Sequence, residues 1–190
     1  MQKVRLANGV YWVGAIDYNI RDFHGYRTPR GTTYNAYLIV DEKIALVDTV
    51  KHGFAEEMLS RIRPIIDPAK IDYLVVNHVE MDHSGSLPEM TKVAAKARIV
   101  TNEKAREALQ RHYRLDDRFM LVKTGDTLSL GSKTLSFIEA PMLHWPDSMF
   151  TYLAEDPLCL CPFSPMERQS RKPLLSMILC GEALSGWPGR

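Results

Sequence analysis

The apolar run "IDYLVV" at 71–76 passes directly into "NHVEMDH", and this junction constrains the fold more than any other stretch of the sequence. A short, continuous apolar run is typical of a strand that is buried on both faces. Two imidazoles and two carboxylates follow it within six positions: His78, Glu80, Asp82 and His83. Side chains at i and i+2 of an extended chain share a face, so we expect His78 and Glu80 to point the same way. Loops at strand ends are where α/β architectures place their chemistry, so the junction predicts a site there.

The four donors after this strand predict a metal site. Two nitrogen and two oxygen donors suit a borderline-to-hard metal better than a metal that seeks thiolates. The alternative, a solvated loop with helix-capping acids, explains one such residue but not four within six positions. We expect Asp82 and His83 in a turn, before a helix that begins near Ser84 or Ser86, because either serine is a suitable N-cap.

The pattern of apolar residues in the first 154 positions predicts short strands that alternate with helices. Strand-like runs lie at 10–16, 34–40, 44–50, 71–76, 98–101, 119–123, 127–130, 134–140 and 149–154. Amphipathic helical patterns lie at 53–64, 86–96 and 102–112. This order predicts an α/β (α+β) fold in which a sandwich of sheets is covered by helices.

Composition indicates an ordinary globular protein of 190 residues, 45% of them hydrophobic and 25% charged. The net charge of +1 gives no electrostatic reason to expect nucleic acid or an anionic membrane as a partner. No apolar run approaches the roughly 20 residues that span a bilayer, and the start lacks a signal-peptide pattern, so we expect a cytoplasmic protein. The cysteines at 159, 161 and 180 have no framework spacing and are interpreted as incidental thiols.

The pattern H-x-[HE]-x-D-H after a buried strand, followed by a distant histidine, resembles the metal-binding signature of the metallo-β-lactamase fold. The variant in this sequence, "HVEMDH", has glutamate in the second position and is similar to that of the flavodiiron proteins, also called A-type flavoproteins. The resemblance covers about residues 1–154 and includes further segments at 21–39, 47–50, 122–131 and 141–153.

This resemblance implies a four-layered αββα domain that holds two irons. Members of the family reduce dioxygen to water, nitric oxide to nitrous oxide, or both. Their electrons reach the irons from FMN in a following flavodoxin-like domain and are often supplied by rubredoxin. In the family's usual homodimer, the flavin of one subunit lies beside the irons of the other.

By the same resemblance, His78, Glu80 and His144 would bind one iron. Asp82 would bind the other, and His83 is a ligand in some members and a neighbour of the ligands in others. Taken alone, a single histidine before a tryptophan, as in "LHW" at 143–145, is more often a packing residue than a ligand. The role of His144 therefore rests on the resemblance.

The carboxylate of Glu80 takes a position where hydrolases of this fold have an imidazole. A carboxylate hardens the site and adds negative charge, which favours iron and redox chemistry. A zinc-dependent hydrolase of the same fold is the alternative function, and Glu80 disfavours it. His24 and Tyr26, in "FHGY", would line the substrate pocket by resemblance, although ordinary turn residues explain them equally well.

The sequence departs from the family pattern after about residue 155. We expect a division into a partial metallo-β-lactamase-like di-iron domain at 1–155 and a divergent tail at 156–190, without a flavodoxin-like domain. The aspartate that bridges both irons has no counterpart in "PLCLCPFSPMERQ", and no histidine follows His144. We therefore expect one bound metal in place of two and no activity from the chain alone. A shifted reading frame, a split enzyme and a non-catalytic metal-binding remnant are the open interpretations.

The tail contains prolines at 157, 162, 165, 173 and 188, which predict few strand ladders there. An incomplete second half of the sandwich would expose the inner faces of the strands between 119 and 154. We expect a marginally stable chain that protease cuts first between about 156 and 172.

Overall fold

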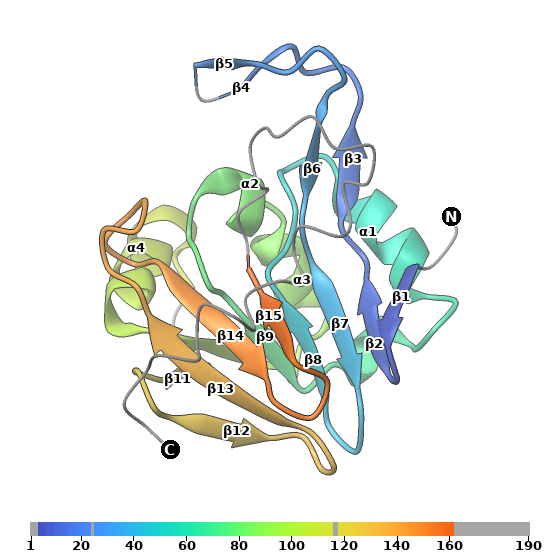
Figure 1. The fold of residues 1–190 in the computed structure, drawn as a ribbon, viewed down its shortest axis with the longest axis vertical. Helices are drawn as coiled ribbons and strands as arrows, with labels where there is room; N and C mark the ends of the chain where they lie inside the picture. Colours follow the sequence, from blue (N-terminus) through green and yellow to red (C-terminus); the bar gives the residue numbers. More distant parts are fainter. Residues whose placement is uncertain (1–3, 24, 116–117, 162–190) are drawn as a thin grey trace.

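Two stacked sheets form the body of the protein, and helices pack on one of them (Figure 1). The computed structural model describes residues 4–23, 25–115 and 118–161. The larger sheet has seven strands in the order β1–β2–β7–β8–β9–β10–β11, and the smaller has four in the order β12–β13–β14–β15. Strands β1, β2, β7 and β8 pair antiparallel, whereas β8, β9, β10 and β11 run parallel. All pairs of the smaller sheet are antiparallel.

The larger sheet consists of β1 (Val4–Ala7), β2 (Val10–Trp12), β7 (Tyr37–Val40), β8 (Ile44–Val47), β9 (Tyr73–Val75), β10 (Arg98–Thr101) and β11 (Phe119–Leu121). The smaller sheet consists of β12 (Thr127–Ser129), β13 (Thr134–Glu139), β14 (Met149–Leu153) and β15 (Leu158–Leu160). Two short ribbons pair β3 (Ala15–Asp17) with β6 (Thr32–Tyr34) and β4 (Asp22–Phe23) with β5 (Tyr26–Arg27). The helices are α1 (Ala55–Ile62), the 3-10 turn η1 (Pro68–Lys70), α2 (Met81–Ser84), α3 (Leu87–Val93) and α4 (Glu103–Tyr113).

Each face of the larger sheet buries its own apolar core, because side chains alternate along the strands. In β7, Leu38 packs with the helices, while Tyr37 and Ile39 face the smaller sheet. Helices α1 and α4 complete the first core with side chains such as Met58 and Leu109, both fully buried. Full burial of one such side chain stabilises the fold by about 1.5–3 kcal/mol.

The three predicted helices and the predicted hairpin are confirmed. Helices α1, α3 and α4 occupy the expected positions, and β7 and β8 pair across the turn that begins at Asp41. The start of α4 is fixed by Asn102, whose side chain accepts a hydrogen bond of 2.9 Å from the backbone N–H of Ala105. This contact satisfies one of the N–H groups that a helix leaves unpaired at its start.

The single strand predicted at 10–16 is two strands that belong to different sheets. β2 ends at Trp12 and pairs with β7, whereas β3 begins at Ala15 and pairs with β6. Gly14 lies between them, and a Cβ there would come within 2.0 Å of the carbonyl oxygen of Tyr34. Only glycine permits this close approach of two backbones, and apolar content alone did not reveal it.

The smaller sheet is closed against the larger one, so the prediction that its inner face is exposed is wrong. Leu135, Phe137 and Leu153 are fully buried in the core between the two sheets. β15 forms directly after Pro157 and pairs with β14, because this proline precedes the ladder and does not interrupt it. The expected protease cut between about 156 and 172 and the expected marginal stability stay predictions, and residues 162–190 lie outside the described residues.

Helices α1, α3 and α4 pack on the face of the larger sheet opposite the smaller sheet. The described residues therefore form an α, a β and a second β layer, in the order that the αββα expectation requires. Within residues 4–23, 25–115 and 118–161, no helix is long and apolar enough to cross a membrane.

Candidate metal centre

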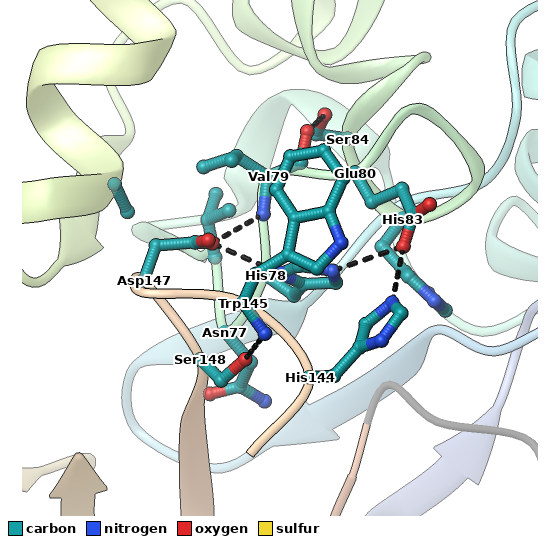
Figure 2. Close-up of polar contacts among 12 residues, drawn as sticks. Asn77, His78, Val79, Glu80, His83, Ser84, His144, Trp145, Asp147 and Ser148 are labelled. Carbon is teal, nitrogen blue, oxygen red and sulfur yellow. Dashed lines mark hydrogen bonds and ion pairs between the residues drawn. The ribbon is translucent and has the colours of Figure 1, made fainter. Parts of the chain in front are cut away.

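Two loops meet at the carboxyl end of the parallel strands β8, β9 and β10 (Figure 2). The first ligand loop, residues 76–86, follows β9 and contains α2. The second ligand loop, residues 140–148, connects β13 to β14. Sheets with parallel strands tend to bind ligands at this edge, so the topology itself places a candidate site between the two loops.

The carboxylate of Glu80 lies between two imidazoles, as Figure 2 shows. Its Oε2 is 3.1 Å from Nε2 of His78 and 2.8 Å from Nε2 of His144. The three potential ligand atoms lie within 4.8 Å of one another. The side chain of His78 is fully buried, whereas that of His144 is 45% exposed, so the cluster opens to solvent on the His144 side. His78 and Glu80 point toward each other as their spacing predicts, although β9 has already ended at Val75.

Asp82 and His83 lie beside this cluster, on the single helical turn α2. Both side chains are buried, and Nε2 of His83 is 2.9 Å from Oδ2 of Asp82. The ring centroid of His83 is 5.8 Å from that of His78. The next helix begins after Ser86, as predicted, but the Ser86 hydroxyl donates to the carbonyl of Lys51 and makes no capping hydrogen bond.

Tyr26, one of the two residues predicted to line a substrate pocket, belongs to the β4–β5 hairpin, which projects at the top of Figure 1. His24 lies outside the described residues. Tyr26 begins β5, and its backbone is paired with Phe23 of β4. The pocket role of both residues stays a prediction.

Hydrogen bonds to the core hold the first ligand loop. The hydroxyl of Ser84 donates to the carbonyl of Val79 at 2.6 Å, and this contact closes the loop on itself. The backbone N–H and the hydroxyl of Thr49 both donate to the carbonyl of His83, each at 2.8 Å. These contacts involve buried groups, so the loop is fixed from inside the protein.

The side chain of Asn77 joins the first ligand loop to both sheets. Its Nδ2 donates to Oδ2 of Asp48 at 3.1 Å and to the carbonyl of Leu160 in β15 at 3.0 Å. Its Oδ1 accepts from the hydroxyl of Thr151 in β14 at 2.7 Å. Asp48 also accepts from the backbone N–H of Asn77 at 2.7 Å, and complete burial raises the pKa of this carboxyl to about 6.

The second ligand loop is exposed and has unusual backbone angles. Met142 and His144 have φ values of 64° and 91°, a region that residues other than glycine rarely adopt. The loop is closed by hydrogen bonds between Met142 N–H and the Trp145 carbonyl, at 2.9 Å, and between Trp145 N–H and Oγ of Ser148, at 3.1 Å. Such angles persist only where surrounding contacts hold them.

Exposed apolar side chains border the cluster on both loops. Met81 belongs to the first loop, and Met142, Leu143 and Trp145 belong to the second. The Trp145 ring packs edge-on against His78, with 5.4 Å between ring centroids. In Figure 2 the indole lies over the imidazole of His78, so it shields one side of the buried ring.

Asp147 is the site residue that sequence reasoning missed. Its Oδ2 is 2.9 Å from Nδ1 of His78 and accepts the backbone N–H of Val79 at 2.8 Å. Burial lowers the pKa of His78, but the carboxylates of Asp147 and Glu80 outweigh it, so the net shift is upward. A carboxylate three residues after His144, in "HWPD", was the available signal, because metal-binding imidazoles are usually oriented by a carboxylate or carbonyl.

The donor chemistry of the cluster fits iron. Two imidazoles and one carboxylate are the protein donors of a common class of non-haem iron site with open coordination positions. A carboxylate held between two imidazoles at the edge of a core also loses much of its hydration, which a bound cation offsets. His78, Glu80 and His144 are therefore the residues that would hold a metal.

Comparison with known proteins agrees with this architecture. Residues 32–159 match the model of a family described as ODP family beta lactamase. This chain belongs to the ODP family. Its fold is accordingly metallo-β-lactamase-like, as the sequence predicts, and the family match continues to residue 159, beyond the predicted boundary at 155.

The ODP-family chain is similar to longer proteins that are named as reductases and oxidases. It is 54% identical over 162 residues to a nitric oxide reductase of Moorella thermoacetica, a match that covers 84% of this chain and 41% of that protein. The structure of rubredoxin oxygen:oxidoreductase from Desulfovibrio gigas matches 81% of the chain with a TM-score of 0.78 and 48% identity. A flavodiiron protein from Giardia intestinalis matches 84% with a TM-score of 0.80 and 43% identity. The chain spans 39% of the length of each of these two structures.

Proposed function

We propose that this chain is the metal-binding part of a flavodiiron oxidoreductase that reduces dioxygen to water, nitric oxide to nitrous oxide, or both. The observation that carries the proposal is the placement of Glu80 between His78 and His144. The names of the similar proteins support the same reaction class, because they include a nitric oxide reductase and a rubredoxin-oxygen oxidoreductase.

Iron would be held by His78, Glu80 and His144. Asp82 and His83, which contact each other beside this cluster, would contribute to the site of a second ion. When bound, iron supplies the redox chemistry that passes electrons to the substrate. The chain's own residues bind and orient: Glu80 provides the charged donor and His78 a buried nitrogen. His144 lies on the solvent side of the cluster, where a small substrate would enter.

The described acidic residues after His144 do not supply a bridge between two irons. Asp147 contacts the far nitrogen of His78, and Glu155 accepts the backbone N–H of Thr134. Asp156 is bonded to Lys133, at the opposite end of β14 from the second ligand loop. We therefore propose that the chain alone holds about one iron and has no reductase activity.

Full activity would then require groups outside residues 1–161. These are a bridging carboxylate, a further histidine and an FMN-bearing flavodoxin-like domain, with rubredoxin or a similar protein as electron donor. A homodimer would bring the flavin of one subunit to the irons of the other. The proposed division of the sequence into 1–155 and 156–190 belongs to this same proposal, with β15 attached to the first part.

Metal analysis of the chain tests the proposal. The protein is produced in iron-supplemented medium, purified without oxygen, and analysed for iron and zinc per chain. We expect at most about one iron per chain. We expect His78→Ala to lose this iron because the substitution removes one of the three proposed donors. His112→Ala, on the exposed side of α4, is the matched control and should keep its iron. Zinc in place of iron would favour the hydrolase alternative, and iron retained by His78→Ala would contradict the ligand assignment.

A further inference from the structure

The buried carboxyl group of Asp147 joins the two ligand loops. It belongs to the second loop, and its Oδ2 accepts from Val79 and contacts His78 in the first. We propose that Asp147 is a positioning residue of the metal centre, which fixes the orientation of His78 and pins the His144 loop against it. The inference rests on the proposed metal binding by His78, Glu80 and His144.

The first part of this role concerns the imidazole of His78. A histidine binds a metal through one nitrogen only, and the hydrogen bond of the other nitrogen decides which one is available. Nδ1 of His78 is 2.9 Å from Asp147, so this nitrogen carries the proton and Nε2 is left to face Glu80. The accepting oxygen is itself held by the Val79 N–H at 2.8 Å, so its position is set by the backbone.

The second part of the role concerns His144. This residue adopts a φ of 91°, an unfavourable backbone angle that surrounding contacts must hold in place. Asp147 lies three positions later and is only 4% exposed. Its carbonyl accepts the side-chain N–H of Asn102 at 2.8 Å, so both ends of the Asp147 residue are anchored. The anchored residue holds the short loop in the form that brings His144 to Glu80.

These two effects are separable by substitution. Asp147→Asn retains an oxygen that accepts the Val79 N–H, so it preserves the loop contact while it removes the charge facing His78. Asp147→Ala removes both contacts. Asp72→Asn is a matched control, because Asp72 also accepts a backbone N–H, that of Ile44, but lies at the amino end of β9, away from the cluster.

The experiment is a titration of the metal-stripped full chain with Co²⁺ and with Zn²⁺, each in competition with a chelator of known affinity. Loss of such an outer partner of a metal-binding histidine weakens binding by about 10–100-fold. We expect Asp147→Ala near the upper end of that range, Asp147→Asn near the lower end, and Asp72→Asn unchanged. Circular dichroism checks that each variant is folded. If Asp147→Ala does not fold, the metal affinity of Asp147→Asn tests the inference by itself.

A second measurement distinguishes positioning from general stability. Nitrogen-15 NMR of the histidines in the Zn²⁺-loaded chain reports which ring nitrogen of His78 carries the proton. We expect a proton on Nδ1 in the unaltered chain and in Asp72→Asn, with faster solvent exchange of that proton in both Asp147 variants. Equal metal affinity and equal exchange in the Asp147 variants and the unaltered chain would overturn the inference. An unaltered chain that binds neither ion would contradict the proposed function.

Discussion

The two ligand loops, which meet at the carboxylate of Glu80, are held in place in different ways. The first, residues 76–86, is buried, and its contacts run into the core through Asn77, Thr49 and Ser84. The second, residues 140–148, lies at the surface and has two residues other than glycine in left-handed backbone conformations. Its ties to the core run mainly through the single residue Asp147. The fold therefore determines the first half of the site, while a few polar contacts determine the second half.

Breaking the core contacts of the first ligand loop should have the largest effect on stability. Asn77→Ala leaves the buried Thr151 hydroxyl and the Asp48 carboxylate without their shared partner. Buried polar groups that lose a partner cost about 1–3 kcal/mol each, so we expect a loss of about 3 kcal/mol. Urea unfolding measures it, with the exposed Asn19→Ala as control. A loss below 1 kcal/mol would mean that the first loop is not built into the fold.

The buried carboxyl of Asp48 should make the stability of this region depend on pH. Its pKa is raised from 3.8 to about 6, so between these values the folded chain binds a proton that the unfolded chain has released. The contribution of Asp48 to the free energy of unfolding therefore falls as pH rises from about 4 to about 6, by on the order of 3 kcal/mol, and is constant above that window.

Asp48→Asn should remove this fall, and the measurement is urea unfolding of both proteins at several pH values. Asparagine tolerates the left-handed backbone of this position, where φ is 58°. A lost or altered hydrogen bond to Asn77 would change the variant's free energy of unfolding by the same amount at every pH. The readout is therefore how this free energy changes with pH. Parallel pH curves for the two proteins would show that Asp48 is already ionised in the folded chain at acid pH.

Substitutions in the second ligand loop should have smaller effects. Trp145 is 40% exposed and contacts His78 edge-on, so Trp145→Ala should cost about 1 kcal/mol, the typical energy of such a ring pair with its partial burial. Trp145→Phe retains an edge-on ring and should recover most of the loss. Thermal unfolding of the metal-free chain measures both, and a larger loss than for Asn77→Ala would reverse the comparison between the loops.

Relief of backbone strain in the second loop should give the smallest effect, and it should be favourable. Met142 is 71% exposed with a φ of 64°, so Met142→Gly removes strain with little loss of packing and should stabilise the chain by about 0.5 kcal/mol. Leu143→Gly, next to it and without a positive φ, should destabilise it slightly because glycine gains freedom when unfolded. Equal effects of the two substitutions would show that the angle at Met142 carries no strain.

The sequence predicted the first ligand loop better than the second for a physical reason. An apolar strand followed by donors at i and i+2 is a local pattern, and local geometry brings His78 to Glu80. His144 reaches them only through the pairing of distant strands, so its role came from resemblance to a family and not from spacing. Asp147 and Asn77 act through contacts that span 69 and 74 positions, which no local pattern encodes.

The same distinction between local patterns and distant contacts explains why the burial of the smaller sheet was predicted wrongly. The apolar alternation of β13 and β14 was visible in the sequence, and both strands formed as predicted. The larger sheet covers their inner faces, and β15, a three-residue strand behind a proline, extends the smaller sheet beside β14. Such a short strand is specified by its partner and carries little signal of its own.

The direction of β15 determines where the chain leaves the described fold. This strand runs toward the ligand loops, and the carbonyl of Leu160 already bonds to Asn77, the neighbour of His78. An extended chain advances about 3.3–3.6 Å per residue, so three residues joined after Cys161 reach about 10 Å. Cys161 is therefore a natural fusion point: a carboxylate-bearing peptide or a flavin-binding module attached there starts beside the proposed metal centre and needs only a short linker.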